Sequence, residues 1–220
     1  MLRTCIATRL TFLVFLLLCV RVDTLAQETR FGIKAGPSYS SIVGELTDGI
    51  KFRFSGHAGV FLHIEFSEKF AFQPEVVYSS QGFQFSSDLF SIDNTNPVDG
   101  NDFRTNVQLN YFTVPLLGNF TLGESYVLQF GPQFGFLLNQ VIKNKNLDER
   151  DGADATSRLT TSGNFQLDYG LAAGIDIKLN EQFSLAPRLY LGLRDRLNGA
   201  EGTAQNFNVA IQLSLNYLFY

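Results

Sequence analysis

The sequence lacks a second long apolar run and has almost no cysteine. Beyond Val20, no stretch approaches the roughly 18 apolar residues of a membrane-spanning helix, which excludes a helical membrane protein. The two cysteines, Cys5 and Cys19, both precede that point. If this first stretch is removed, the remaining chain has no disulfide, no thiol nucleophile and no cysteine metal ligand.

The first residues have the organisation of an export signal. Arg3 and Arg9 supply a positive start, Leu10 to Val20 an apolar core, and residues 24–26 a small-residue cleavage site. This core is short for a membrane anchor, and Leu18 before Cys19 disfavours a lipoprotein signal. We therefore expect residues 1–26 to be a cleaved signal peptide.

Positive charge is also scarce. The formal net charge is −4, and it becomes −6 without residues 1–26, because that segment carries three arginines and one aspartate. Nucleic-acid-binding domains are instead typically basic. We expect no nucleic-acid partner.

What the sequence does have is strict alternation of apolar and polar residues. It is clearest in residues 165–179, 183–193 and 207–219. A period of two predicts a strand with one apolar and one polar face. Soluble strands average about five or six residues, whereas membrane-spanning strands need roughly 9–11. A soluble lipocalin-like barrel is the alternative, but it would turn the apolar face inward and would rarely need strands this long.

Five earlier segments complete a set of eight strands. The predicted strands are 31–40, 52–66, 70–85, 105–120, 126–139, 165–179, 183–193 and 207–219. In the fourth strand, which alternates poorly, we expect Phe112, Val114, Leu116 and Phe120 to face outward. The connections alternate between long (41–51, 86–104, 140–163, 195–205) and short (67–69, 121–125, 180–181).

This pattern fits bacterial outer-membrane barrels, which have an even strand number, short periplasmic turns and longer external loops. The sequence therefore predicts an all-β fold for residues 27–220. We expect this domain to be an eight-stranded antiparallel up-and-down transmembrane β-barrel in a Gram-negative outer membrane. Both termini would be periplasmic, and the outer face would contact outer-membrane lipid.

Aromatic residues support the membrane placement. They cluster where the strands meet the predicted periplasmic boundary, as aromatic girdles do. These residues are Phe31, Phe66, Phe70, Phe120, Tyr126, Phe183 and Phe219.

Prolines inside the predicted strands count against a closed barrel, because proline has no N–H for the strand ladder. They are Pro37, Pro74, Pro115, Pro132 and Pro187. Each must lie at a bulge, at a strand end, or where one ladder bond is lost.

The predicted inner face carries a polar network. Its charged and histidine members are Lys34, Arg53, His57, His63, Glu65, Glu75, Asp168, Asp176, Lys178, Arg188 and Arg194. Because an eight-stranded barrel is just wide enough for side chains to fill it, we expect these groups to pair and plug the lumen. Inward glycines would make room opposite the long cations. A narrow channel or ligand pocket is the alternative.

Catalysis and metal binding have little support in the sequence. His57 and His63 are about 20 Å apart along one strand and cannot share a metal. A catalytic His57 with Glu75 or Asp168 would still need a nucleophile, and no such motif is present. The acidic residues at 148–154 lack the spacing of a calcium loop. We expect no enzyme activity, no metal and no cofactor.

Several motifs resemble the PorT-type outer membrane protein β-barrel family. They are the segments 31–36 (FGIKAG), 73–79 (QPEVVYS), 111–117 (YFTVPLL), 131–135 (GPQFG) and 187–192 (PRLYLG). The resemblance spans nearly all of residues 27–220, and the recurring prolines are part of it. It implies a small Gram-negative outer-membrane barrel, and the PorT member itself is linked to protein secretion.

Two functions follow as expectations. The first is a non-enzymatic structural or interaction barrel, including an accessory role with other envelope or secretion proteins. The second is a narrow channel or small-solute-binding barrel that uses the charged lumen.

Overall fold

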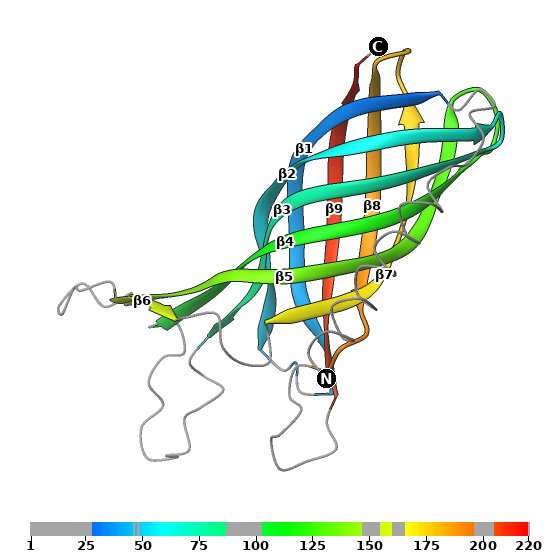
Figure 1. Cartoon of the computed structure of the whole chain (residues 1–220). Helices are drawn as coiled ribbons and strands as arrows, with labels where there is room; N and C mark the ends of the chain where they lie inside the picture. The colour runs from blue at the N-terminus through cyan, green and yellow to red at the C-terminus, as the bar shows by residue number, and fades with distance from the viewer. Residues whose placement is uncertain are drawn as a thin grey trace, which may run out of the picture.

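The structure is a computed structural model that describes residues 28–45, 47, 49–86, 103–146, 155–159, 166–195 and 205–219. The predicted signal peptide lies outside these residues. The strands are β1 (Thr29–Gly44), β2 (Ile50–Ser67), β3 (Phe70–Ser86), β4 (Phe103–Thr121), β5 (Tyr126–Asn146), β6 (Ala155–Leu159), β7 (Leu167–Lys178), β8 (Phe183–Gly192) and β9 (Asn206–Leu218). Figure 1 shows their arrangement. Among the described residues, no helix is long and apolar enough to cross a membrane.

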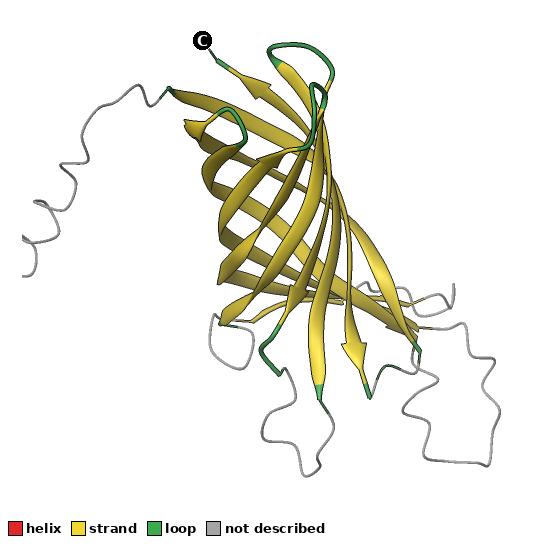
Figure 2. Cartoon of the chain, turned by 90° about the vertical axis from the view of Figure 1, so that its right-hand side faces the viewer, coloured by secondary structure: helices red, strands yellow, loops and turns green. Residues whose placement is uncertain are grey.

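Eight of these strands form a closed antiparallel barrel, which confirms the predicted fold class. The order is β4-β3-β2-β1-β9-β8-β7-β5, and β4 also pairs with β5 to close the ring (Figures 1 and 2). The start of β1 and the end of β9 lie side by side, because Gly32 pairs with Leu218. They share one end of the barrel with the β2–β3, β4–β5 and β7–β8 turns. We call this the turn end and the opposite one the loop end.

The predicted third loop, 140–163, begins too early. β5 continues to Asn146, which pairs with Phe103, and the short β6 pairs with β5 at residues 140–144. Polar residues such as Lys143 and Asn144 indicated a loop, but the neighbouring strand β4 continues to pair with their backbone. The acidic residues at 148–154 lie outside the described residues.

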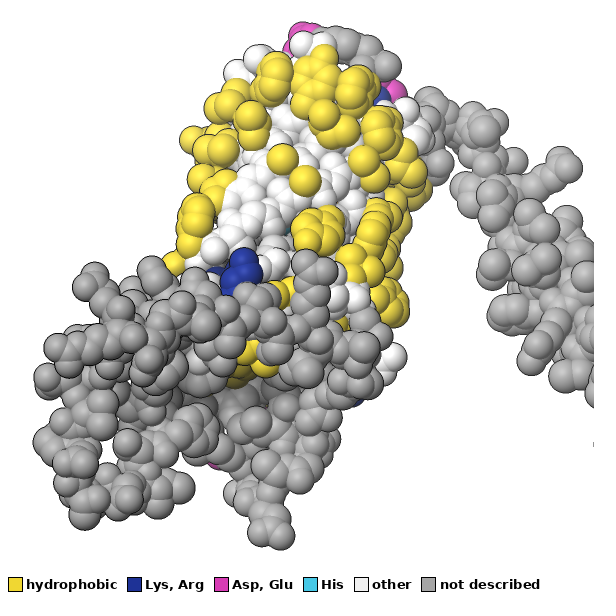
Figure 3. Space-filling view, turned by 90° about the vertical axis from the view of Figure 1, so that its left-hand side faces the viewer, with side chains coloured by type: hydrophobic (Ala, Val, Ile, Leu, Met, Phe, Trp, Pro, Cys, Tyr) yellow, Lys and Arg dark blue, Asp and Glu magenta, His cyan; other side chains and the backbone are white. Residues whose placement is uncertain are grey.

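Most outward side chains are apolar, whereas most inward ones are polar or small. Figure 3 shows apolar side chains spread over one outer face of the barrel. In β4, Phe112 and Phe120 are exposed, whereas Tyr111 and Leu117 are at most 1% exposed, so the predicted register is correct. On β8 and the residue that follows it, the outward positions run from Phe183 to Leu193. Ten residues at about 3.3 Å each, tilted by about 40°, span roughly 25 Å, the height of an apolar membrane band.

Aromatic rings line the turn end in two contacting groups. Phe70 lies 5.9 Å from Phe66 and 5.2 Å from Phe120 between ring centroids. Across the β8–β9–β1 side, rings of Phe183, Tyr217, Phe219 and Phe31 contact in series at 4.9, 4.9 and 5.6 Å. Phe219, the penultimate residue, therefore belongs to the outward aromatic set.

The strand prolines each interrupt one ladder without shifting its register. Pro132 pairs with Leu171 of β7, but on its other side the β4–β5 ladder passes from Pro115↔Gln133 to Gly118↔Phe130. The same two-pair gap occurs beside Pro74 toward β2, Pro115 toward β3, Pro37 toward β9 and Pro187 toward β7. Of the three possibilities, the loss of ladder bonds on one side is the one that the structure shows.

The inward glycines mostly allow neighbouring strands to approach, so the prediction that they make room for long cations is wrong for most of them. A Cβ at Gly36 would lie 1.8 Å from the carbonyl oxygen of Leu213, and one at Gly131 would lie 2.0 Å from that of Leu116. Only Gly174 has Arg188 among its nearest neighbours. At Gly36, Gly59, Gly131 and Gly170 the nearest atom is a backbone carbonyl oxygen of the neighbouring strand, so these four glycines permit tight packing between adjacent strands.

Candidate functional site

A cluster of buried charges lies in the middle of the lumen. Glu75 of β3 accepts two hydrogen bonds from Arg188 of β8, at 2.8 and 2.9 Å, and two from Lys34 of β1, at 3.0 and 3.2 Å. All three side chains are at most 1% exposed. Arg188 also donates to Gln129 Oε1 at 2.7 Å, and Gln73 donates to Glu75 at 2.8 Å.

This central cluster spans the barrel. In the order of the eight barrel strands, β3 and β8 are four positions apart, so they face each other across the lumen. The bidentate bond between Glu75 and Arg188 therefore bridges the full width of the interior. Charge-assisted bonds of this geometry offset much of the desolvation cost of the three ions.

Packing continues toward the loop end. Leu117, Ala172, Tyr190 and Ala210 form one buried apolar cluster, and Val107, Leu109, Tyr111 and Leu137 form another. The lumen is thus filled by apolar as well as polar side chains. These residues occupy inward positions of β4, β5, β7, β8 and β9, and the predicted polar network included none of them.

His57 is held by two serines. Its Nδ1 lies 2.8 Å from Ser38 Oγ and its Nε2 lies 2.7 Å from Ser214 Oγ. Neither ring nitrogen is bonded to Glu75 or Asp168, the partners that a catalytic arrangement would have used. Within the described part of the chain, no group of three or more His, Cys, Asp or Glu residues could hold a metal ion.

The remaining predicted network residues lie toward the two ends. At the loop end, Arg53 donates to Asn106 and Ser80, Asp168 accepts from Asn208 at 2.7 Å, and Arg194 donates to the carbonyl of Leu167.

At the turn end, Glu65 pairs with Arg30, and its carboxylate lies 3.3 Å from His63. Asp176 accepts from Asn216 at 2.9 Å, while Lys178 is exposed. These residues border an open cavity.

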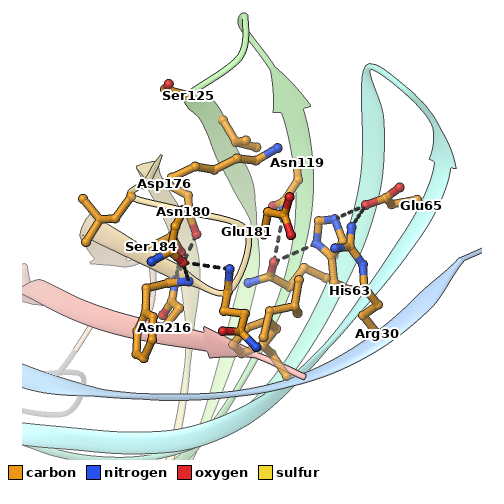
Figure 4. A pocket seen from close by; sticks show the side chains of 18 of the residues that line it. Arg30, His63, Glu65, Asn119, Ser125, Asp176, Asn180, Glu181, Ser184 and Asn216 are labelled. Carbon is orange, nitrogen blue, oxygen red and sulfur yellow. Dashed lines mark hydrogen bonds and ion pairs between the residues drawn. The ribbon is translucent and has the colours of Figure 1, made fainter. Parts of the chain in front are cut away.

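The turn-end cavity has a volume of about 500 Å³. Its inner wall includes the buried side chains of Gln73, Asn119 and Asn216, and its rim includes residues of the β4–β5 and β7–β8 turns. Figure 4 shows Arg30, His63 and Glu65 on one side and Asp176, Ser184 and Asn216 on another.

Sequence reasoning named the charged members of the interior but missed the amides that join them. Gln73 accepts from Asn119 at 2.8 Å and donates to Glu75, so it connects the cavity wall to the central cluster. On other strands, Gln129 accepts from Arg188, and Asn216 joins Asp176 to Ser184. Their position in the strands could have identified them, because each lies at an inward-facing position of the apolar–polar alternation.

Comparison with known proteins agrees with this architecture. A model of the family described as "Outer membrane protein beta-barrel domain" matches residues 25–198. The chain belongs to this family. It is therefore a small outer-membrane β-barrel protein, and its apolar outer face contacts lipid. A search of curated proteins found no match.

The chain is also similar to several solved structures. Neisserial surface protein A is 10% identical, with a TM-score of 0.47, covering 86% of this chain and 97% of that one. Ail of Yersinia pestis is 14% identical, with a TM-score of 0.45, covering 87% and 99%. OprG of Pseudomonas aeruginosa is 14% identical, with a TM-score of 0.39, covering 88% and 97%.

Proposed function

We propose that this outer-membrane barrel is a non-enzymatic structural or interaction protein whose lumen does not conduct. The observation that carries the proposal is the central cluster, in which Glu75, Arg188 and Lys34 bridge opposite strands and are buried. The apolar cluster around Tyr190 adds a second filled layer. A barrel closed in this way offers its ends, rather than its pore, to other molecules.

The proposal includes an orientation and a partner class. The short turns, the start of β1 and the end of β9 all lie at the turn end. In bacterial outer-membrane barrels the short turns are periplasmic, so the turn end faces the periplasm. The resemblance to PorT-type barrels supports an accessory role with envelope or secretion proteins. Crosslinking in native envelopes, followed by mass spectrometry, tests this role: recovery of the barrel without any envelope partner would contradict it.

The alternative is a narrow channel or solute-binding barrel. Planar-bilayer recording separates conduction from closure. We expect no stepwise conductance from the wild-type protein, whereas a channel would show steps whose ion selectivity changes in Arg188→Ala. Such steps in the wild type would refute the closed lumen.

A further inference from the structure

Strands β3, β4 and β5 continue beyond the apolar band at the loop end. We call these continuations, together with the short strand beside them, the wing: residues 80–86 of β3, 103–110 of β4, 139–146 of β5, and β6. The β3–β4 and β4–β5 ladders run through the wing without a break. In Figure 1 the ends of β4 and β5, with β6, project away from the barrel wall at the lower left. The wing is therefore part of the barrel sheet, and its outer face continues the face that contacts lipid.

On β4 the outer face changes from apolar to polar where the wing begins. Phe112 is exposed, and the residues that precede it on the same side of the strand are Asn110, Gln108 and Asn106. The residues between them, Tyr111, Leu109 and Val107, are at most 4% exposed and face the interior. On β4 the wing thus has an amide-rich outer side and an apolar inner side.

One row of this outer face crosses four strands. Its members, which are partners in the strand register, are Lys51 of β2, Gln84 of β3, Asn106 of β4 and Lys143 of β5. The two lysines at its ends are exposed, and Arg53 donates to Asn106 at 2.8 Å. Because neighbouring strands lie about 4.8 Å apart, the Cα atoms of the two lysines are about 14 Å apart. One two-residue step farther along the same strands, Arg104 pairs with Lys145.

The wing has positive charge without negative charge. Neither the wing nor the adjoining residues 50–53 contain aspartate or glutamate. Their ionisable residues are Lys51, Arg53, Arg104, Lys143, Lys145 and Arg158. Figure 3 shows positive side chains at the loop-end margin of the apolar surface. The chain as a whole is acidic, so this concentration of positive charge is local, and it attracts anions.

The anion nearest to this face is the lipid headgroup. Phe54, which is 72% exposed, marks the apolar surface of β2, and Lys51 lies three residues beyond it. At about 3.3 Å per residue and a tilt of about 40°, Lys51 lies about 8 Å farther from the membrane centre. The headgroup layer on each side of a bilayer is about 5–7 Å thick, and a lysine side chain can reach it along its aliphatic stem. Charge and position therefore favour the same ligand.

We propose that the outer face of the wing binds anionic lipid headgroups in the leaflet at the loop end. In this arrangement Lys51 and Lys143 contact the phosphate groups, and the amide of Asn106 between them donates a hydrogen bond. Asn106 accepts from Arg53 through its carbonyl oxygen, which leaves its amide nitrogen to donate. The site lies on the outer face, so the proposal is independent of whether the lumen conducts.

Native mass spectrometry of the folded protein in a neutral detergent tests the proposal, with equal concentrations of phosphatidylglycerol and phosphatidylcholine as probes. We expect the protein to retain the anionic phosphatidylglycerol in preference to the zwitterionic phosphatidylcholine. The chain supplies matched double variants, because Lys51 and Lys143 are exposed at the loop end and Lys69 and Lys178 at the turn end. Lys51→Gln with Lys143→Gln should weaken phosphatidylglycerol binding about tenfold or more, because two basic residues are lost from the anionic surface. Lys69→Gln with Lys178→Gln should weaken it less than about twofold, since exposed glutamates in the turns already offset these lysines.

Equal retention of the two lipids by the wild type, or equal losses in the two double variants, would overturn the proposal. The segments 87–102 and 147–154 contain acidic residues, and if these neutralised the wing the wild type would show no preference. Displacement of phosphatidylglycerol by an equal concentration of glycerol 3-phosphate would assign the face to a soluble anion instead of a lipid. If a double variant does not fold, the two lipids and glycerol 3-phosphate on the wild-type protein still decide. Failure here leaves the bilayer recording untouched, so the two proposals are judged separately.

Discussion

Glu75→Gln tests the central cluster most directly. The substitution keeps the shape of the side chain but removes the carboxylate that accepts two hydrogen bonds from Lys34 and two from Arg188. It leaves two buried cations facing a neutral amide. Removal of one partner from a buried ion pair costs about 3–5 kcal/mol, and we expect a loss of unfolding free energy in this range.

Arg188→Gln should cost less, although it removes the longer side chain. Glu75 then keeps Lys34 and Gln73 as partners, so no ion is left without a counterion. The expected loss is about 1.5–3 kcal/mol, the range for hydrogen bonds to charged groups. Which of the two variants loses more unfolding free energy therefore depends on the charge balance in the lumen and not on the volume of the side chain removed.

Urea-dependent folding into lipid vesicles, followed by gel shift and circular dichroism, measures both losses. Glu68→Gln, in the exposed β2–β3 turn, removes the same charge away from the cluster and should stay within about 0.5 kcal/mol of the wild type. If Glu75→Gln cost no more than Glu68→Gln, or less than Arg188→Gln, the reasoning from buried charge would be refuted.

Two further predictions concern the outer face and the strand contacts. Leu189→Lys, midway along the apolar band, should lower the free energy of unfolding by about 2–4 kcal/mol, and Leu193→Lys, at the edge of the band, by about 0–1 kcal/mol. The same folding assay measures both losses, and equally small losses would argue against contact with lipid. Gly36→Ala should lower the free energy of unfolding by about 1–3 kcal/mol, because its Cβ would clash with the carbonyl oxygen of Leu213. Gly56→Ala should be nearly neutral, because a Cβ there lies 3.5 Å from its nearest neighbour. Comparable folded fractions of the two variants would contradict this reasoning.

The fold was predictable because one physical rule governs every strand. In a membrane barrel, each outward position faces hydrocarbon and each inward position faces the lumen, so the period of two survives along the whole strand. The rule identified even the poorly alternating β4, where Tyr111 is inward and Phe112 outward. It was weakest at the loop end, where strands leave the band and polar residues such as Lys143 continue to pair.

The candidate site was predictable only in part. Alternation shows that Glu75 and Arg188 both face inward, but they are 113 residues apart in sequence. Their contact depends on strand order, which places β3 opposite β8, and on the stagger between strands, which sets their relative height. Short turns fix which strands are neighbours, but local sequence does not specify which residues meet across the lumen.

The uncharged residues of the interior explain why the stagger matters. Gln73, Asn119 and Asn216 carry no charge, so they gave no signal beyond their inward position. Each acquires a role only when its height matches that of a partner: Gln73 meets Glu75 and Asn119, and Asn216 meets Asp176. If one strand were shifted by two residues relative to its neighbour, these contacts would be exchanged for others, but the outer face would remain equally apolar. Membrane insertion therefore constrains only the outer face, while the contacts that fill the lumen depend on how the inner residues are matched in height.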